Sequence, residues 1–245
     1  MIFRLYLLWM RASRGTMSGH MHIRRAPWEA VVSVPEPDHS TTKPTVTLFE
    51  SYGSGAEEIG PRVADALGVA YHPQAFTSEQ LEEPPDKRQD EGLLSRIFAA
   101  MGGSYAALDG PSVAMAQRDD HELVLQNTRW VMQAARSGAV IVGRNGAMIL
   151  AKWPGALHVR LDGPLPQRIE RAARTGGIGT DRAAKRQRRE DQLRADMSIS
   201  LYGWDPRDPT RYDLVLNTGT LDVQTSVDII VHAAQINARR TVSTS

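Results

Sequence analysis

The chain has 245 residues, of which 41% are hydrophobic and 23% charged, an ordinary balance for a globular protein with a substantial core. Its 29 Lys and Arg against 28 Asp and Glu give a formal net charge of +1, so no global field favours nucleic acid or a membrane surface. The absence of cysteine excludes disulfides, thiolate zinc sites and cysteine nucleophiles, and the cytoplasm is the expected compartment.

The first part of the chain is predicted to lie outside the folded domain. Its apolar start, MIFRLYLLWMR, is shorter than the roughly 20 residues that span a bilayer. Four prolines then follow among polar residues, up to Pro44. We interpret residues 1–42 as a flexible extension, 43–240 as the domain and 241–245 as a tail.

Five apolar segments bounded by turn residues predict strands, at Thr45–Phe49, Val69–Tyr71, Ala139–Val142, Leu157–Leu161 and Tyr212–Leu216. Helical spacing is found between them, near 56–67, 77–83, 93–101, 119–137, from Ala147, around Ile169, along an Arg-rich segment to Ser200, and at 223–236. Strands that alternate with helices predict βαβ units. The expected fold class is therefore α/β, with a five-stranded parallel sheet flanked by helices in three layers.

The turn after the first strand predicts an anion site, because the first amides of a helix lack partners. The full phosphate-loop pattern is G-x-x-x-x-G-K-[ST]. With Gly55 as its second glycine, this chain has Glu50, Ala56 and Glu57 at the other three fixed positions. A helix-capping glycine turn is the alternative. Pro61 should kink or restart the following helix, with Gly60 as its cap.

Three segments, FESYGSGAEEIG, VGRNGAMIL and WDPRDPTRYDLVLNT, together resemble the cytidylate kinase-like family of P-loop kinases. That family typically has SREYGSGGREIG at the first segment, so Glu50 and Glu57 stand near two of its arginines. The resemblance implies a P-loop kinase-like fold with a helical acceptor region and an Arg-rich closing segment. It also implies ATP and Mg²⁺, although the seven histidines predict no dedicated metal site.

The same resemblance implies the site residues. Arg144, at the end of a buried strand, corresponds to the arginine that holds the acceptor phosphate, and a structural salt bridge is the alternative. The closing segment of the family has R-x-x-x-D-x-x-R, which Asp191 and Arg194 match at its last two positions. Catalytic roles are expected for Arg144, Arg188, Asp191 and Arg194; substrate binding for Arg144, Asp162 and Arg186; and nucleotide binding for Gly53, Ser54, Gly55, Ala56, Glu57 and Asn217.

Two of these assignments have a structural alternative. Asp162 can simply cap the next helix. A solvated helix face with i,i+4 pairs explains Arg168 and Arg171 better than a closing loop does. The Arg-rich segment lacks interleaved aromatic residues, which argues against nucleic acid as a partner.

The implied reaction is transfer of the ATP γ-phosphoryl group to a nucleoside monophosphate such as CMP. The competing hypothesis is a pseudokinase that keeps the fold but has lost the triphosphate cradle, and serves as a nucleotide sensor or a partner-binding module. The missing lysine and the two loop carboxylates favour the pseudokinase, and Arg144, Asp191 and Arg194 argue against it. A kinase for another small metabolite stays open, because Ala75–Gln117 has no recognisable base-reading motif.

Overall fold

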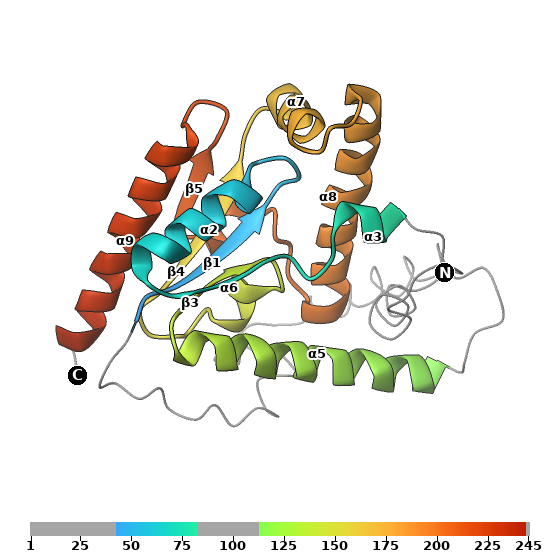
Figure 1. Ribbon diagram of the computed structural model, residues 1–245. Coiled ribbons are helices and arrows are strands. Elements are labelled where there is room, and N and C mark those ends of the chain that lie inside the picture. The colour runs from blue at the N-terminus through green and yellow to red at the C-terminus, as the bar shows by residue number, and fades with distance from the viewer. Residues whose placement is uncertain (1–42, 83–112, 244–245) are drawn as a thin grey trace, which may run out of the picture. The chain divides into compact units, whose positions relative to one another are not determined.

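A parallel sheet of five strands organises the structure, a computed structural model that describes residues 43–82 and 113–243 (Figure 1). The strands lie in the order β2–β3–β1–β4–β5, and every neighbouring pair is parallel. Their bounds are β1 Thr45–Glu50, β2 Ala70–His72, β3 Ala139–Val142, β4 Ala156–Asp162 and β5 Leu214–Asn217. The predicted α/β fold with five parallel strands is confirmed. The last strand begins at Leu214 rather than at Tyr212.

The central strands are buried on both faces, which explains their nearly continuous apolar sequences. All four residues of β3 are buried, and β1 exposes only Phe49 in part. The two threonines of β1 find partners: Thr45 Oγ1 donates to the Ala135 carbonyl over 3.1 Å, and Thr47 Oγ1 lies 2.8 Å from Nδ1 of His158. Their polar atoms are therefore satisfied inside the sheet packing.

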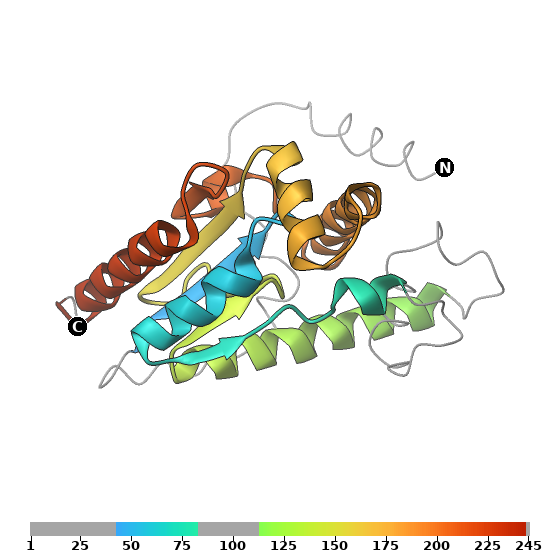
Figure 2. The same cartoon turned by 45° about the horizontal axis from the view of Figure 1, so that its top comes forward.

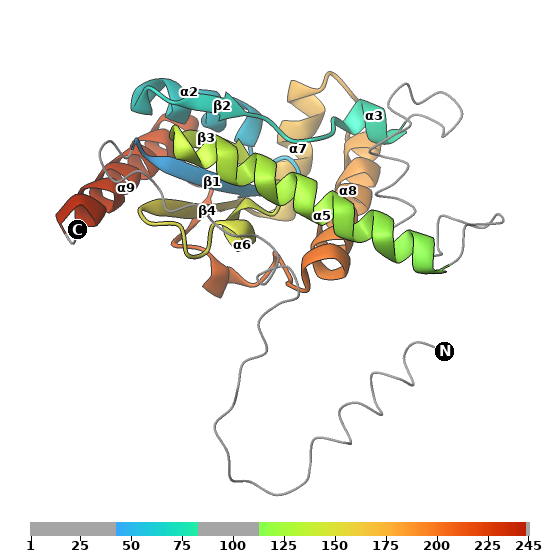
Figure 3. The same ribbon diagram turned by 90° about the horizontal axis from the view of Figure 1, so that it is seen from below.

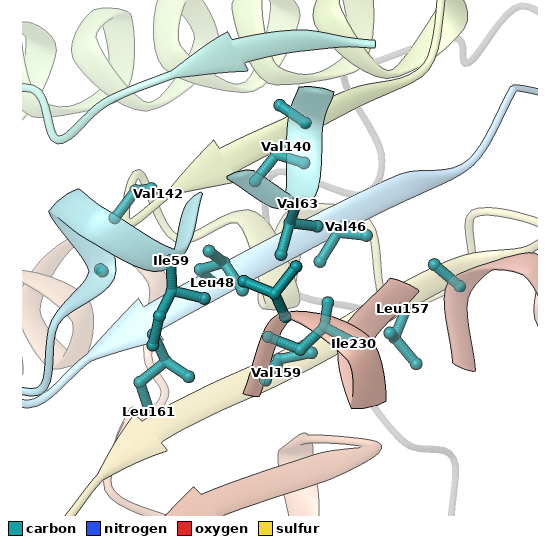
Figure 4. Close-up of a cluster of buried hydrophobic side chains, with 14 of the residues drawn as sticks. Val46, Leu48, Ile59, Val63, Val140, Val142, Leu157, Val159, Leu161 and Ile230 are labelled. Carbon is teal, nitrogen blue, oxygen red and sulfur yellow. The ribbon is translucent and has the colours of Figure 1, made fainter. Parts of the chain in front are cut away.

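Helices α2 (Ala56–Leu67) and α9 (Val223–Ser243) cover one face of the sheet (Figure 2). Their apolar residues interlock with those of β1, β3 and β4 in the main core (Figure 4). Its members include Val46, Leu48, Ile59, Val63, Val140, Val142, Leu157, Val159, Leu161 and Ile230. Helix α9 continues beyond the predicted domain boundary at residue 240.

The predicted break in α2 is wrong. The helix runs without interruption through Pro61, and Gly60 is buried inside it rather than capping it. The hydrogen bond that Pro61 cannot make would go to the carbonyl of Glu57, an exposed residue of the first turn that water can reach. Gly60 has a packing role instead, because a Cβ there would lie 2.6 Å from the Tyr71 ring.

Helices α5 (Val113–Arg136) and α6 (Gly146–Ile149) pack on the opposite face (Figure 3). Helix α5 begins at Val113 rather than near Asp119. The short helix α3 (Ser78–Glu82) follows β2 as predicted. The helix predicted at 93–101, and with it most of the acceptor region, lies outside the described residues.

Helices α7 (Leu165–Thr175) and α8 (Thr180–Tyr202) stand beyond the carboxyl ends of the strands, where parallel sheets carry their ligand sites (Figure 1). A 3₁₀ helix at Pro209–Arg211 leads into β5. None of the helices in the described ranges has the length and apolar character needed to cross a membrane.

Candidate functional site

A glycine-rich loop, residues 51–55, turns the chain from β1 into α2 at the carboxyl edge of the sheet. Gly53 and Gly55 have φ angles of 79° and 91°, in the left-handed region. A Cβ on Gly53 would lie 2.3 Å from the carbonyl oxygen of Arg168, so the close approach of this phosphate loop to α7 requires glycine. The loop presents the first amides of α2, which have no helical acceptor.

The carboxylate of Glu50 occupies that anion position. Glu50 ends β1 and is only 7% exposed. The amides of Gly55 and Ala56 donate to its Oε1 over 2.9 and 3.1 Å. Burial raises the pKa of Glu50, while the positive charge of Arg194 and the two amides oppose the rise. We call the amides of Gly55 and Ala56 the cradle. Glu57 is exposed in the first turn of α2, so Glu50 is the one of the two loop carboxylates that enters the cradle.

Asp191 ties α8 to the phosphate loop. Its Oδ1 accepts the amide of Tyr52 over 2.7 Å. Its Oδ2 accepts Nη1 of Arg168 over 3.0 Å and Nε2 of Gln187 over 2.8 Å. A carboxylate with three donors fixed on it is a positioning group for the loop, and its catalytic role stays a prediction.

Two arginines of α7 complete the support of the loop. Arg168 is 8% exposed and donates from Nη1 to the Tyr52 carbonyl over 3.0 Å. Arg171 donates to the Gly53 carbonyl over 3.0 Å, to the Thr218 hydroxyl over 2.9 Å and to the Thr218 carbonyl. The interpretation of Arg168 as part of a solvated face is wrong. The sequence could have indicated this role, because the helix follows β4 directly and a spacing of three residues places the side chains of Arg168 and Arg171 on one face.

The other predicted residues of α8 lie in three different settings. Arg194 donates from Nη2 to Oε2 of Glu190 over 3.0 Å, and Glu190 is 2% exposed, so burial raises its pKa. Arg186 is buried and forms an ion pair with Glu79 of α3 at 2.8 Å, which joins α8 to α3. Arg188 is exposed. The positive charge of Arg194 acts on Glu50, and that of Arg186 acts on Tyr52 of the phosphate loop.

A cavity of about 470 Å³ opens beside the carboxyl ends of β1 and β3, between α5, α8 and the β3–α6 turn. Its walls are mainly apolar and aromatic, and its polar groups include Asn127, Arg144 and Arg194. The apolar part is contributed by Phe76, Leu123, Trp130, Met197, Leu201 and Trp204.

Arg144 stands at the wall of this cavity in a strained turn. Arg144 and Asn145 have φ angles of 53° and 55°, unusual for residues other than glycine. Side chains hold the turn: Asn127 donates to the Arg144 carbonyl over 2.9 Å, and Trp204 donates to Oδ1 of Asn145 over 2.9 Å. Strain that is fixed in this way is typical of functional sites.

The guanidinium of Arg144 carries a charge that no carboxylate of the described residues neutralises. Its Cζ lies 4.2 Å from the centroid of the Trp130 ring, and its buried Nε has no hydrogen-bond partner. Burial alone lowers its pKa. The alternative of a structural salt bridge therefore finds no support in the described parts of the chain.

Asp162 and Asn217 end β4 and β5 side by side in register. Asp162 accepts the Gly163 amide over 2.8 Å and Nη2 of Arg160 over 2.5 Å, and Asn217 accepts the Gly219 amide over 3.0 Å. Both side chains shape turns here, and their substrate and nucleotide roles stay predictions. A second cavity, of about 320 Å³, lies next to them, between Gly55, Arg171 and the loop from Thr218 to Val223.

Three features define a P-loop, nucleotide-binding fold of the kinase type: the strand order, the glycine loop between β1 and α2, and the arginines that α7 brings to this loop. The chain belongs to the cytidylate kinase-like family, whose profile matches residues 45–220.

Three comparisons illustrate the relationship. Cytidylate kinase of Methanopyrus kandleri is 32% identical over 182 residues, which cover 71% of this chain and 83% of that enzyme. Uronate isomerase of Corynebacterium glutamicum is 39% identical over 110 residues, 45% of this chain but 21% of that protein. Among solved structures, an uncharacterized protein from Eubacterium ventriosum superposes with a TM-score of 0.56 at 16% identity, over 79% of this chain and 99% of that one, a likeness of fold.

Proposed function

We propose that this protein binds a nucleoside monophosphate such as CMP in the 470 Å³ cavity, with Arg144 on its phosphate, and that it acts as a nucleoside monophosphate kinase-like enzyme. The reaction implied by the family is transfer of the ATP γ-phosphoryl group to that acceptor. The observation that carries the proposal is the unneutralised guanidinium of Arg144 at the cavity wall.

The chemistry of the cavity supports a ligand of this class. Its volume falls within the usual range of small-molecule sites, roughly 300–1,000 Å³. Aromatic walls suit a base, and a guanidinium holds a phosphate with two parallel hydrogen bonds. Because Arg144 is partly desolvated, an ion pair formed there is stronger than one in open water.

ATP and Mg²⁺ fit the described residues less well. The described ranges contain no group of three His, Asp or Glu side chains placed to hold a metal ion. Glu57 stands where the phosphate-loop pattern has its metal-binding hydroxyl. The cradle amides of Gly55 and Ala56 are engaged by Glu50, so a triphosphate has no free place there in this conformation.

That occupied cradle favours a second candidate function. A protein that keeps the acceptor cavity but does not transfer phosphate would act as a nucleotide sensor or as a partner-binding module. The two candidates share the acceptor site and differ in turnover.

Calorimetric titration with CMP, UMP, AMP and GMP tests the acceptor site. A hexuronate belongs in the same panel, because part of the chain is similar to a uronate isomerase and a guanidinium also binds carboxylates. Arg144→Ala should weaken binding by about 1.5–3 kcal/mol, or about 10- to 150-fold. The control is Arg136→Ala, which removes an exposed guanidinium from the helix that carries Trp130.

Equal affinity in Arg144→Ala and wild type, with both folded, would reject the acceptor site. Release of ADP in the presence of the bound acceptor then separates an enzyme from a sensor.

A further inference from the structure

The hydrogen bonds between Glu50 and the cradle suggest a role that neither candidate function requires. We propose that Glu50 is a carboxylate plug: it occupies the place of a phosphate group in the phosphate loop, and the loop accepts a phosphate chain only when this side chain leaves. The inference uses the phosphate loop of the proposed function but not its acceptor.

The geometry makes plug and ligand mutually exclusive. Oε1 accepts both amides at 2.9 and 3.1 Å, within the range of good hydrogen bonds. A phosphate oxygen bound by the same two amides would have to lie where Oε1 lies. Phosphate binding at this helix start therefore requires that the carboxylate move.

Only the side chain of Glu50 is free to make that movement. Its backbone lies in β1, in register with Leu161 of β4, and the next amide, that of Ser51, donates to the Leu161 carbonyl over 3.0 Å. Rotation about the side-chain bonds of Glu50 would clear the cradle while the sheet and the loop keep their places. The plug is thus a local device.

Arg194 connects the plug with the rest of the site. Its positive charge acts on Glu50. It also donates to Glu190 over 3.0 Å and lies 3.7 Å from a carboxylate oxygen of Asp191. One of its nitrogens, Nη1, is buried without a hydrogen bond.

The plug should lower the apparent phosphate affinity to the intrinsic affinity multiplied by the fraction of time that the cradle is open. When only a fraction of the molecules is competent to bind, the apparent dissociation constant rises by the inverse of that fraction. A cradle that is closed about 90–99% of the time loses about 10- to 100-fold in affinity.

The test uses the full chain and two probes, inorganic tripolyphosphate and ATP with Mg²⁺, titrated calorimetrically. Glu50→Ala removes the plug and should bind tripolyphosphate at least about tenfold more tightly than wild type. Glu50→Gln keeps the shape and loses the charge, so its affinity should lie between the two. Glu57→Gln is the matched comparison, because it removes the same charge from the same helix start without touching the cradle amides. Because Glu57 is exposed and makes no hydrogen bond to the cradle amides, its gain in affinity should be smaller than that of Glu50→Gln.

Three results would overturn the plug: folded Glu50 variants that bind tripolyphosphate like wild type, a wild type that already binds it as tightly as Glu50→Ala, or equal gains in Glu50→Gln and Glu57→Gln. If Glu50→Ala does not fold, Glu50→Gln decides, and a gain below threefold rejects the idea. Titration with CMP is read separately. Failure of CMP to bind sinks the acceptor site and leaves the comparison of Glu50 variants intact, whereas normal CMP binding with no effect of Glu50 sinks the plug alone.

Discussion

Replacing Asp191 with Asn is expected to loosen α8 and the phosphate loop together. The carboxylate accepts the amide of Tyr52, Nη1 of Arg168 and Nε2 of Gln187 over 2.7, 3.0 and 2.8 Å. Asparagine keeps one acceptor oxygen and turns the other into a donor. At least one of the three donors therefore loses its acceptor, and Arg168 loses its nearest countercharge.

The magnitude follows from the burial of Arg168. Its side chain is 10% exposed, and removing one partner of a buried ion pair costs about 3–5 kcal/mol. Asp162, with a carboxylate oxygen 3.7 Å from Nε of Arg168, remains and offsets part of this loss. We expect a loss of about 3 kcal/mol in the free energy of unfolding, which lowers the melting temperature of a domain of this size by about 6–12 °C.

Thermal and urea unfolding, followed by circular dichroism, measure the effect. Asp196→Asn is the matched control, since Asp196 is exposed on the same helix and accepts Nε2 of Gln192 over 2.7 Å. That control should change stability by less than about 0.5 kcal/mol. Hydrogen exchange of the Tyr52 amide should accelerate in Asp191→Asn alone. Equal stability of the two variants and unchanged exchange at Tyr52 would refute the role of Asp191 in holding α8 to the phosphate loop.

Three further predictions concern the loop, its carboxylate and the chain start. Gly53→Ala should lower the free energy of unfolding by more than about 2 kcal/mol, because the new Cβ would lie 2.3 Å from a carbonyl oxygen at a positive φ. Gly177→Ala is the control, because φ is 59° there and no atom lies within 4 Å, and it should cost about 1 kcal/mol. Equal losses in urea unfolding would contradict this prediction. Burial raises the pKa of Glu50, so its contribution to stability is greatest below the ordinary glutamate pKa of about 4.3 and is lost as the pH rises through the raised value. The stability of Glu50→Gln relative to wild type should therefore increase from pH 5 to pH 8, and a difference that is constant with pH would argue against a buried charge. A chain that begins at Lys43 should melt within a few degrees of the full chain, because β1 and the family match both begin at residue 45, and a larger drop would contradict the predicted domain boundary.

The sequence predicts the sheet well where a strand is a continuous apolar run between turn residues, as in β1, β3 and β4. For β5 the sequence predicts a start that is two residues too early, because Tyr212 has the composition of a strand residue. Its hydroxyl donates to the Pro206 carbonyl over 2.8 Å, and its amide to the Pro209 carbonyl over 3.2 Å. An aromatic residue that packs from a loop has the same hydrophobic signal as one in a strand.

The site is predictable only in part, for a similar reason. The position of Arg144 at the cavity could be predicted, because residues at the carboxyl end of a buried parallel strand line the ligand crevice, and its role on a phosphate stays a prediction. The side chain of Glu50 could have turned to solvent or into the cradle, and that choice depends on α2 and Arg194, which meet it only in the folded chain. The buried position of Arg168 is not predicted, because a helical pattern assigns an arginine to the solvated face. In the folded chain Arg168 donates to three acceptors outside its helix, and these hold its side chain in a buried position.

Helix α8 contacts both the phosphate loop and the 470 Å³ cavity, and this has a thermodynamic consequence for ligand binding at the two sites. Asp191, on one side of the helix, holds the phosphate loop at Tyr52, while Met197 and Leu201 line the 470 Å³ cavity. A ligand in the cavity that shifts α8 must therefore alter the free energy of phosphate binding at the loop. By linkage, phosphate at the loop alters the affinity of the cavity ligand by the same factor. The affinity of the cavity ligand, measured with and without saturating phosphate, would give this coupling free energy as a ratio.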